Sequence, residues 1–367
     1  MAVSNDMATD RRVDRHCRAL AEAGCEVVVV CRQAWEGEAL AGETGCGAYE
    51  VRRVGVRHRR GWRFYAELNR AIVWAIVEAE PDVVWANDTD TLLGCHWAVE
   101  RIRREYGRRP LLVMDAHELF PEVPELEGRG LVKRVWRGLE RWLMPKCDVR
   151  FTVSQGIADY YGKRYGVEMK VVRNVPPMAA VGSGMRTEKK NMLLYQGCIN
   201  RGRGVDWAIE AMQWLEGCEL VIAGGGDLET EMRALAESRP WRERIRFTGR
   251  ISPEALAELT RQAAVGLVML EDRGLSYHYA LPNRVGDFVA AGVPMVVSDL
   301  PEMAAVVRRY GVGEVMAEPG ARALAEAVKW VLAREWSEAD FAQARREMDW
   351  EQEKLILTET IKTRLAG

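Results

Sequence analysis

The stretch GLSYHYALPNRVGDFVAAGVPMVVSD at residues 274–299 shows the alternation that decides the fold of this chain. A polar and aromatic loop carrying Pro282 and Asn283 leads into a short helical segment that ends at the sequence AAG. The apolar run at residues 293–297 follows at once and predicts a buried strand. A loop that feeds the N-terminus of a helix, next to a buried strand, is how α/β proteins present phosphate or another anionic ligand. The stretch therefore predicts an α/β sheet with an anion site at its edge.

The same alternation of helix and strand runs through both halves of the sequence. Residues 13–23 have helical periodicity and end at a glycine, and EVVVVC at residues 26–31 then predicts a buried parallel strand. Similar pairs of helical and apolar segments recur as far as residue 154, and they restart with NMLLYQG at residues 191–197. This pattern indicates parallel sheets with helices on both faces.

The regular pattern is interrupted once, at residues 174–190, where prolines, glycines, serine and charges accumulate. Such a composition marks a linker or a domain boundary. We therefore expect two Rossmann-like, doubly wound α/β domains that face each other across a cleft, residues 1–177 and residues 178–349. The terminal segment 350–367 has helical periodicity and is expected to pack back on the first domain.

Length and composition agree with two domains. A chain of 367 residues exceeds what one hydrophobic core usually organises. The formal net charge of -2 argues against a nucleic-acid binder, and the eight cysteines include no CxxC pair, as is typical of reduced thiols in a cytoplasm. No apolar run reaches the roughly 18 residues of a membrane span, and the N-terminus has no signal-peptide core. A cytoplasmic protein is expected, with any membrane contact peripheral.

Candidate ligand-binding residues lie just after the predicted strands, because ligands of open α/β sheets bind beyond the carboxyl ends of the strands. In the first domain these segments are rich in carboxylate, amide and imidazole groups, which suit hydroxyl recognition and proton handling. They predict the acceptor side of a transfer reaction. The candidates there are Asp6, Asp10, Arg11, Asp88 and Glu118.

In the second domain the corresponding segments have a different chemistry. GCINRGRG at residues 197–204, GGGD at residues 224–227 and GRIS at residues 249–252 combine glycine turns with arginines. Backbone N–H groups in glycine turns and guanidinium forks together suit a diphosphate. The second domain is therefore predicted to hold a nucleoside diphosphate.

Several of these segments occur in an order and spacing that carry a family resemblance. They include ND-x-x-x-D-x-R-V at the start, WANDTDTLL, DAHELFPE, TVSQGIADYY, RNVPP, YQGCINRGRGVDWAIEAM, LVIAGGGD, IRFTGRIS and LPNRVGDFVAAGVPMVVSDLPE. The chain resembles the retaining GT-B glycosyltransferases of the family-four type, also called glycosyl transferases group 1, over nearly its whole length. The opening segment MAVSND is shorter than the apolar first strand usual in that family.

The resemblance implies a donor-binding set in the second domain. The family's two glutamates, separated by seven residues, fall on Tyr279 and Asp287, and the second of them binds the ribose hydroxyls of the donor nucleotide. An aspartate can accept hydrogen bonds from both hydroxyls, with a shorter reach. The implied donor-binding residues are Gly197, Gly224, Gly225, Arg250, Tyr279, Leu281, Pro282, Asn283, Arg284 and Asp287.

The resemblance also implies the catalytic groups. His117 matches a family histidine that faces the donor sugar, and Arg201 and Arg203 would stabilise the leaving diphosphate. Cys198 stands where the family usually has an arginine, so Arg201 is expected to compensate. Such enzymes need no bound metal and no cofactor beyond the nucleoside diphosphate sugar, and the sequence has no close cluster of metal-ligating residues. The acceptor's proton would pass to the leaving phosphate oxygen.

The implied function is transfer of a sugar from a nucleoside diphosphate sugar to a glycan or lipid-linked acceptor. The nucleotide of the donor would be UDP or GDP. Cell-envelope or exopolysaccharide assembly is the expected setting. A catalytically idle nucleotide- or glycan-binding subunit is one alternative, motivated by Tyr279 and Cys198. A nucleotide-sugar epimerase of the same architecture is another. A nicotinamide oxidoreductase is the weakest, because neither domain shows GxGxxG with an acidic residue about 20 positions on.

Each candidate also has a structural interpretation. His117 alone would more often be a structural histidine, and Asp287 alone a carboxylate near a helix N-terminus. His16, on a predicted helix, and His58, in an arginine cluster, are expected on the surface. His278 lies in the loop that precedes Pro282 and is left open between a sugar contact and the surface.

Two segments combine arginines or lysines with aromatic side chains. They are VRRVGVRHRRGWRF at residues 51–64 and VKRVWRGLERWLMPK at residues 132–146. Basic residues interleaved with aromatics suit contact with an anionic membrane, as in family members that use lipid-linked acceptors. A solvated face is the alternative. Peripheral association with the inner face of the plasma membrane is the resulting expectation.

Overall fold

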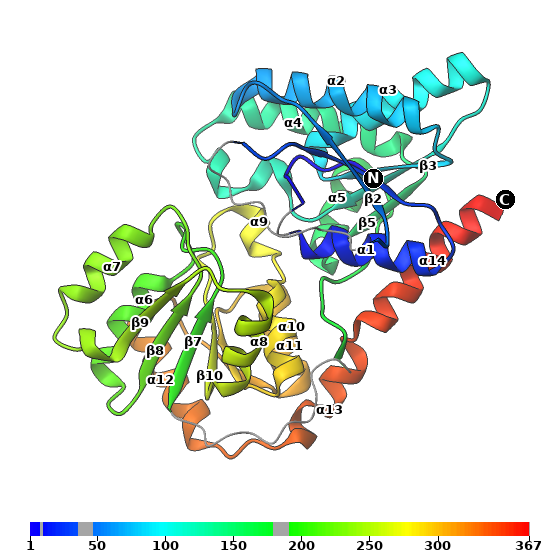
Figure 1. The fold of residues 1–367 in the computed structure, drawn as a ribbon. Helices are drawn as coiled ribbons and strands as arrows, with labels where there is room; N and C mark the ends of the chain where they lie inside the picture. The colour runs from blue at the N-terminus through cyan, green and yellow to red at the C-terminus, as the bar shows by residue number, and fades with distance from the viewer. Residues whose placement is uncertain (8–9, 36–46, 179–190, 367) are drawn as a thin grey trace. The chain divides into compact units, whose positions relative to one another are not determined.

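The computed structural model describes the whole chain except residues 8–9, 36–46, 179–190 and 367 (Figure 1). The chain divides into two compact units. The first comprises Met1–Val172 together with Glu353–Gly367, and the second comprises Arg173–Gln352. The chain passes from the first unit to the second a little before the position expected from composition.

The first unit is built on parallel strands. Its strands are β1 (Val28–Arg32), β2 (Glu50–Val54), β3 (Val83–Asn87), β4 (Leu111–Ala116), β5 (Val149–Thr152) and β6 (Lys170–Val171). β1 pairs with β2, and β3 to β6 form a four-stranded sheet in sequence order. Ala2 makes parallel bridges to Val30 of β1 and Ala86 of β3. The short opening segment thus occupies the place of a strand between β1 and β3.

Helices follow most of these strands. They are α1 (Arg11–Glu22), α2 (Gly61–Ala79), α3 (Thr89–Tyr106), α4 (Gly130–Leu143), α5 (Gln155–Tyr165) and α14 (Trp350–Ala366), with short 3-10 turns η1 (Phe120–Glu122), η2 (Pro124–Leu126) and η3 (Met144–Lys146). α1 begins after Asp10, whose side chain accepts a hydrogen bond from the backbone N of Val13. In α14, Lys354 pairs with Glu22 of α1, and Thr360 accepts a hydrogen bond from Lys170 at 3.1 Å.

The second unit contains one parallel sheet of six strands. They are β7 (Met192–Gln196), β8 (Glu219–Ala223), β9 (Ile245–Gly249), β10 (Val265–Val268), β11 (Met295–Val297) and β12 (Gly313–Val315). Their spatial order is β12-β11-β10-β7-β8-β9, the order of doubly wound nucleotide-binding sheets. The direction of winding reverses between β7 and β10. Ligands of such sheets bind at this reversal, beyond the carboxyl ends of the strands.

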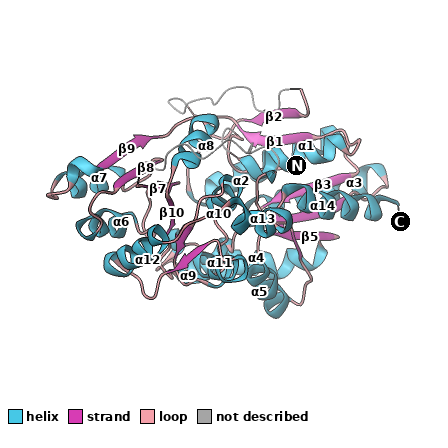
Figure 2. Cartoon of the chain, turned by 90° about the horizontal axis from the view of Figure 1, so that it is seen from below, coloured by secondary structure: helices cyan, strands magenta, loops and turns pink. Residues whose placement is uncertain are grey.

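Helices cover both faces of this sheet (Figure 2). They are α6 (Val205–Ala211), α7 (Glu229–Glu237), α8 (Pro253–Gln262), α9 (Gly274–His278), α10 (Asn283–Ala291), α11 (Pro301–Tyr310), α12 (Ala321–Ala333) and α13 (Glu338–Glu347), with short turns η5 (Met212–Trp214) and η6 (Arg242–Arg244). β7 sends Leu193 and Tyr195 into one core and Met192 and Leu194 into the other. Alternate residues of a strand point to opposite faces, so the uninterrupted apolar sequence of β7 fills both cores.

The stretch 274–299 forms α9, α10 and β11 in turn. The sequence predicted a loop before α10, whereas the structure places a short helix, α9, in the first part of it. Pro282 lies just before α10, where its fixed backbone angle suits a helix start, and Gly292 ends α10 at a φ of 65°.

Candidate donor and acceptor sites

In the first unit, His117 lies just beyond β4 between two carboxylates. Its Nε2 is 3.3 Å from Oδ2 of Asp115, and its Nδ1 is 3.4 Å from Oδ2 of Asp88. The backbone N–H of His117 donates to Oδ1 of Asp88 at 2.8 Å. Because both ring nitrogens face carboxylates, the imidazole is positively charged here. To donate a hydrogen bond to a ligand, the ring must first give up its contact with Asp88 or Asp115.

Asp115 is the buried anchor of this group. Arg12 of α1 binds it with two hydrogen bonds, from Nε at 3.0 Å and from Nη2 at 2.6 Å. The remaining nitrogen, Nη1, donates to the backbone oxygen of Val172 at 2.7 Å. Such a bidentate pair holds the carboxylate rigidly beside His117. Arg12 and Asp115 lie within two of the motifs that carry the family resemblance, but neither was among the candidate site residues.

The expectation that His16 lies on the surface was wrong. Its ring is completely buried, 3.3 Å from Asp115 and edge-on to Trp85. The reason lies in the spacing along α1, where His16 follows Arg12 by four residues and adjoins Cys17 on the face that packs against the sheet. That shared face was the signal in the sequence.

The two histidines have opposite charge states. Burial lowers the pKa of His117, but Asp88 and Asp115 more than offset it and raise the value to about 9. For His16, burial and then the Arg12 charge lower the pKa to about 4. Burial acts to raise the pKa of Asp115, but Arg12 and His117 together hold it well below its usual range. At neutral pH the group is therefore a charged His117 and a neutral His16 around one carboxylate.

Asp88 has an unusual backbone conformation. Its φ is 61° and its ψ is 168°, a region that residues other than glycine rarely adopt. Such a conformation costs about 1–3 kcal/mol and persists only where neighbouring contacts hold it. Here the N–H of Asp88 donates to the backbone oxygen of Asp115 at 2.9 Å, while its side chain binds His117.

Asp90 follows in the first turn of α3 and is buried. Its Oδ1 makes no hydrogen bond with any residue that the structure describes. Burial and then the neighbouring charge of Asp88 raise its pKa to about 7. The carboxyl group is thus poised between its neutral and charged forms.

The other expected acceptor-side residues are placed as follows. Asp10 caps α1 and accepts a hydrogen bond from the side chain of Asn5 at 2.7 Å. Asp6 lies 3.9 Å from Arg32. Arg11 and Glu118 are exposed. Of this set, Asp88 contacts His117 directly.

Two further histidines, His58 and His278, pair with carboxylates outside these groups. His58 pairs with Glu67 at 2.6 Å, and each is partly exposed. His278, at the end of α9, pairs with the exposed Asp272 at 3.1 Å.

In the second unit, two glycine turns touch at the ends of β7 and β8. Gly197 and Gly224 have φ values of 134° and 140°. A Cβ added to Gly224 would lie 1.9 Å from the backbone oxygen of Gly197, so only glycine fits. The backbone N of Ile199 donates to the oxygen of Gly225 at 3.1 Å and joins the two turns.

The expected arginines of this region differ in their contacts. Arg201 and Arg250 are exposed. The guanidinium of Arg203 lies over the ring of Tyr277 at 4.7 Å. Its Nε is buried without a hydrogen-bond partner among the described residues. Arg203 is thus a cation that rests on an aromatic ring, with hydrogen-bonding capacity left for an anion.

Arg284 holds the strand ends from within. It is buried, and its two terminal nitrogens donate to the backbone oxygens of Gln196 and Met269 at 3.0 and 3.1 Å. Its guanidinium lies 4.9 Å from the ring of Tyr195. Burial is the main cause that lowers its pKa. These contacts tie the loop after β7 to the loop after β10, across the reversal of the sheet.

Asp287 projects from α10 into a short chain of polar contacts. Its Oδ2 accepts a hydrogen bond from the side chain of Gln196 at 3.0 Å, and Gln196 accepts one from Thr260 at 2.9 Å. Gln196 was not among the residues predicted from the sequence, although a polar side chain at the end of an apolar strand was its signal. At the start of α10, Asn283 accepts a hydrogen bond from Asn174 at 2.7 Å.

Tyr279 and Leu281 complete the expected set on this segment. Both side chains are partly exposed, and so is Pro282. Tyr279 packs edge-on against His278, with 4.7 Å between the ring centres.

Within the described residues, no group of three or more histidine, cysteine, aspartate or glutamate side chains has the arrangement of a metal site. Over the same residues, no helix is long and apolar enough to cross a membrane.

Two Rossmann-like units of parallel strands, with polar groups gathered at the strand ends, define the GT-B class of glycosyltransferases. Residues 9–178 match the family described as Glycosyltransferase Family 4, and residues 183–348 match Glycosyl transferases group 1. The chain belongs to the group 1 glycosyltransferases of the family 4 type. The expected fold class and family are confirmed.

Solved structures share the fold at low sequence identity. Sucrose-phosphate synthase from Thermosynechococcus elongatus matches with a TM-score of 0.76 and 18% identity, over 96% of this chain and 92% of its own. Anabaena HepE, in complex with UDP-glucose, matches with a TM-score of 0.76 and 13% identity, over 99% and 98%. WaaG, a glycosyltransferase involved in lipopolysaccharide biosynthesis, matches with a TM-score of 0.67 and 18% identity, over 97% and 98%. A search of curated proteins finds no match.

Proposed function

We propose that this glycosyltransferase moves a sugar from a nucleoside diphosphate sugar to a glycan or lipid-linked acceptor, with retention of anomeric configuration. Assembly of a cell-envelope or exopolysaccharide glycan is the proposed setting. The observation that carries the proposal is the pair of touching glycine turns at Gly197 and Gly224, beside the guanidinium of Arg203 with its unpartnered nitrogen. Because HepE has been solved in complex with UDP and with UDP-glucose, UDP is the first nucleotide to test.

In this proposal the second unit binds the donor. Backbone N–H groups of the turns and the cations Arg201, Arg203 and Arg250 hold the diphosphate. Asp287 accepts hydrogen bonds from the ribose hydroxyls, and the segment from Tyr279 to Asn283 lies along the sugar and pyrophosphate. Arg284 supports the site indirectly, because its terminal nitrogens already bind the backbone oxygens of Gln196 and Met269 at the ends of β7 and β10.

Positive charge around the diphosphate favours the reaction. As the bond from the anomeric carbon to the phosphate oxygen breaks, negative charge grows on the leaving diphosphate. Fixed cations and backbone N–H groups stabilise that charge more in the transition state than in the ground state. The acceptor oxygen bonds to the anomeric carbon on the face that the diphosphate leaves, and its proton passes to the leaving phosphate oxygen. No metal enters this scheme.

In the first unit, we assign the acceptor side to Asp6, Asp10, Arg11, Asp88 and Glu118. His117 acts as a cation toward the donor sugar or diphosphate. Asp115 and Asp88 keep it charged, and Arg12 keeps Asp115 in place.

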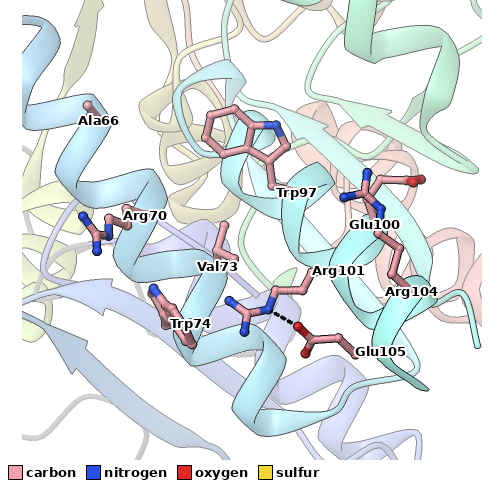
Figure 3. A pocket seen from close by; sticks show the side chains of 9 residues that line it. All are labelled: Ala66, Arg70, Val73, Trp74, Trp97, Glu100, Arg101, Arg104 and Glu105. Atoms are coloured by element: carbon pink, nitrogen blue, oxygen red, sulfur yellow. Dashed lines mark hydrogen bonds and ion pairs between the residues drawn. The ribbon is translucent and has the colours of Figure 1, made fainter. Parts of the chain in front are cut away.

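Peripheral contact with an anionic membrane is proposed for residues 51–64 and 132–146 of the first unit. Their apolar side chains include Trp62, which is 75% exposed. A groove of about 660 Å³ between α2 and α3 adds the exposed Trp74 and Trp97 (Figure 3). There the Arg101 guanidinium stacks 4.0 Å from the centre of the Trp74 ring, and its Nε donates to Glu105 at 2.8 Å. Tryptophan beside arginine is typical of the membrane interface.

The first test is a thermal-shift screen of the full chain against UDP, GDP, ADP and their common sugar conjugates, with EDTA and then with magnesium. Ligand that binds the native state raises the melting temperature. We expect one nucleotide series to raise it equally with and without metal. If no nucleotide raises it, the donor-site assignment fails.

A turnover assay with the bound donor separates the alternatives. Transfer or hydrolysis of the sugar excludes an idle binding subunit, for which the exposed Cys198 in the donor loop is the motivating observation. Conversion of the donor into its epimer without an acceptor would instead identify an epimerase.

A further inference from the structure

Besides the groove between α2 and α3, the first unit contains a cationic pocket between α4 and α5. It has a volume of about 490 Å³. Its lining residues are Arg134, Arg137, Gly138 and Arg141 of α4 and Arg164 and Tyr165 of α5. The three arginines of α4 are three and four residues apart, which places them on one face of the helix. Four guanidinium groups therefore border one concave surface.

The four guanidinium groups differ in their partners among the described residues. Arg137 binds Glu122, with its Nε at 2.9 Å. The Nε of Arg164 donates to the hydroxyl of Tyr165 at 3.3 Å, and its guanidinium lies 5.7 Å from the ring centres of Tyr160 and Tyr165. The side chains of Arg134 and Arg141, in contrast, make no hydrogen bond or ion pair with other residues in the described part of the chain.

The nearest acidic residue of α4 is turned away from the pocket. Glu140 is completely buried, and its carboxylate accepts hydrogen bonds from Thr89 and Tyr161 at 2.9 Å each and from Tyr165 at 2.7 Å. No lining residue of this pocket is acidic, whereas the groove between α2 and α3 includes Glu100 and Glu105 (Figure 3). The two concave surfaces thus differ in charge, because the groove lining combines three arginines with two carboxylates, whereas the α4–α5 pocket lining has four arginines and no carboxylate.

We propose that the α4–α5 pocket binds a phosphate group, as a phosphomonoester or a diphosphate, at a site separate from the donor-binding loops. For a lipid phosphate this inference rests on the membrane contact proposed for residues 132–146. Clustered guanidinium forks match the oxygens of phosphate and favour a doubly charged anion over a single carboxylate. Beside the arginine face, α4 exposes an apolar stripe at Leu131, Val135 and Trp142, the first two 78% and 62% exposed. A lipid phosphate can contact the arginines with its phosphate and the apolar stripe with its acyl chains, whereas a soluble phosphate can contact only the arginines.

The test compares charge variants of the full chain. Arg134→Ala with Arg141→Ala removes the two unpaired guanidiniums. Arg308→Ala with Arg322→Ala is the matched control, because these arginines are exposed on α11 and α12 and the same net charge is lost. Arg134→Lys with Arg141→Lys keeps the charge and removes the forks.

Binding is measured in two arms. The first is co-flotation with vesicles of phosphatidylcholine that contain phosphatidic acid, with phosphatidylcholine alone as reference. The second is calorimetry with inorganic pyrophosphate in saturating UDP, so that the donor loops are occupied. We expect the alanine pair to weaken binding by roughly tenfold for each guanidinium removed, the lysine pair to weaken it less, and the control pair to leave it unchanged.

Each outcome decides the proposal. A selective loss of vesicle binding establishes a lipid phosphate as the source, and a selective loss of pyrophosphate binding alone establishes a soluble one. Equal losses in the alanine and control pairs, or no loss in either arm, overturn the site. The UDP thermal shift of each variant reports folding and the donor loops independently, so failure of the proposed function is seen separately.

Discussion

His117 and its carboxylates show how a single residue acquires its properties from its neighbours. A histidine that is 20% exposed would ordinarily titrate near neutrality, yet Asp88 and Asp115 keep it charged. Asp88 achieves this through a backbone conformation that costs energy, which is how positioning residues at functional sites are often held.

Asp88→Asn tests that role directly. The amide keeps the shape of the side chain and removes its charge, so the pKa of His117 should fall from about 9 toward its ordinary value. NMR titration of the histidine ring signals measures this pKa. Asp10→Asn is the control, since Asp10 caps α1 and does not contact His117. An unchanged pKa in Asp88→Asn would show that Asp115 alone sets the charge state.

The same pKa values predict how stability varies with pH. The pKa of His117 is raised on folding, so its stabilising contribution is full below about pH 6.5 and is lost as pH rises through about 9. The pKa of His16 is lowered, so its contribution falls as pH drops from about 6.5 through about 4. Stability of the first unit from this pair should therefore be greatest near pH 6.5.

Urea unfolding at a series of pH values measures this effect. In His117→Gln the decline between about pH 6.5 and 9 should flatten, while the acid decline due to His16 persists. A decline of equal slope in wild type and variant would assign the pH dependence to other groups.

Asp287→Ala tests the role proposed for a single carboxylate in donor binding. Loss of hydrogen bonds to the ribose should weaken nucleotide binding by roughly 1–3 kcal/mol, measured by calorimetry. Asp272→Ala is the control, because Asp272 is exposed and pairs with His278. Equal affinities for wild type and Asp287→Ala would remove Asp287 from the donor site.

At the scale of elements, the touching turns after β7 and β8 explain why glycine is needed at particular positions. Gly224 and Gly217 both have positive φ, but only at Gly224 would a Cβ meet backbone atoms. Substitution of Gly217 therefore tests backbone strain alone, whereas substitution of Gly224 adds a steric clash.

Gly224→Ala should destabilise the second unit by several kcal/mol and abolish the UDP thermal shift, because Gly197 would have to move. Gly217→Ala carries the strain of positive φ alone and should cost about 1 kcal/mol. Urea unfolding and thermal shift measure both effects. Similar behaviour of the two variants would mean that the turns can separate without loss of the site.

The arginines of the same loop carry the charge stabilisation proposed for catalysis. Arg201→Ala with Arg203→Ala should slow transfer far more than it lowers the melting temperature, since one side chain is exposed and the other rests on Tyr277. Steady-state kinetics with the donor identified by thermal shift measure the rate. Full turnover in this variant would place the diphosphate elsewhere.

At the scale of the whole molecule, local patterns in the chain predicted the architecture well. Apolar runs such as β7 are uninterrupted because both faces of a parallel sheet are covered, and this signal is visible without coordinates. The glycine turns and the helix after Pro282 were also predicted, since tight turns and helix starts depend on local residues.

The contacts of the sites were less predictable. Arg12 and Asp115 are 103 residues apart in the chain, yet they form the bidentate pair that anchors His117. Arg284 was expected among the donor-binding residues from the family resemblance, whereas its hydrogen bonds to two strand ends depend on backbone oxygens that no motif encodes.

The sequence by itself determined the two-unit α/β architecture, the family and the segments at the strand ends, because periodicity and turn chemistry are local properties. Only the tertiary structure decided that His16 is buried and neutral, that His117 is charged, and that the side chains of Arg134 and Arg141 have no partner among the described residues. Charge states and pairings depend on which distant groups lie within a few ångströms and on how far water is excluded, and folding alone sets both.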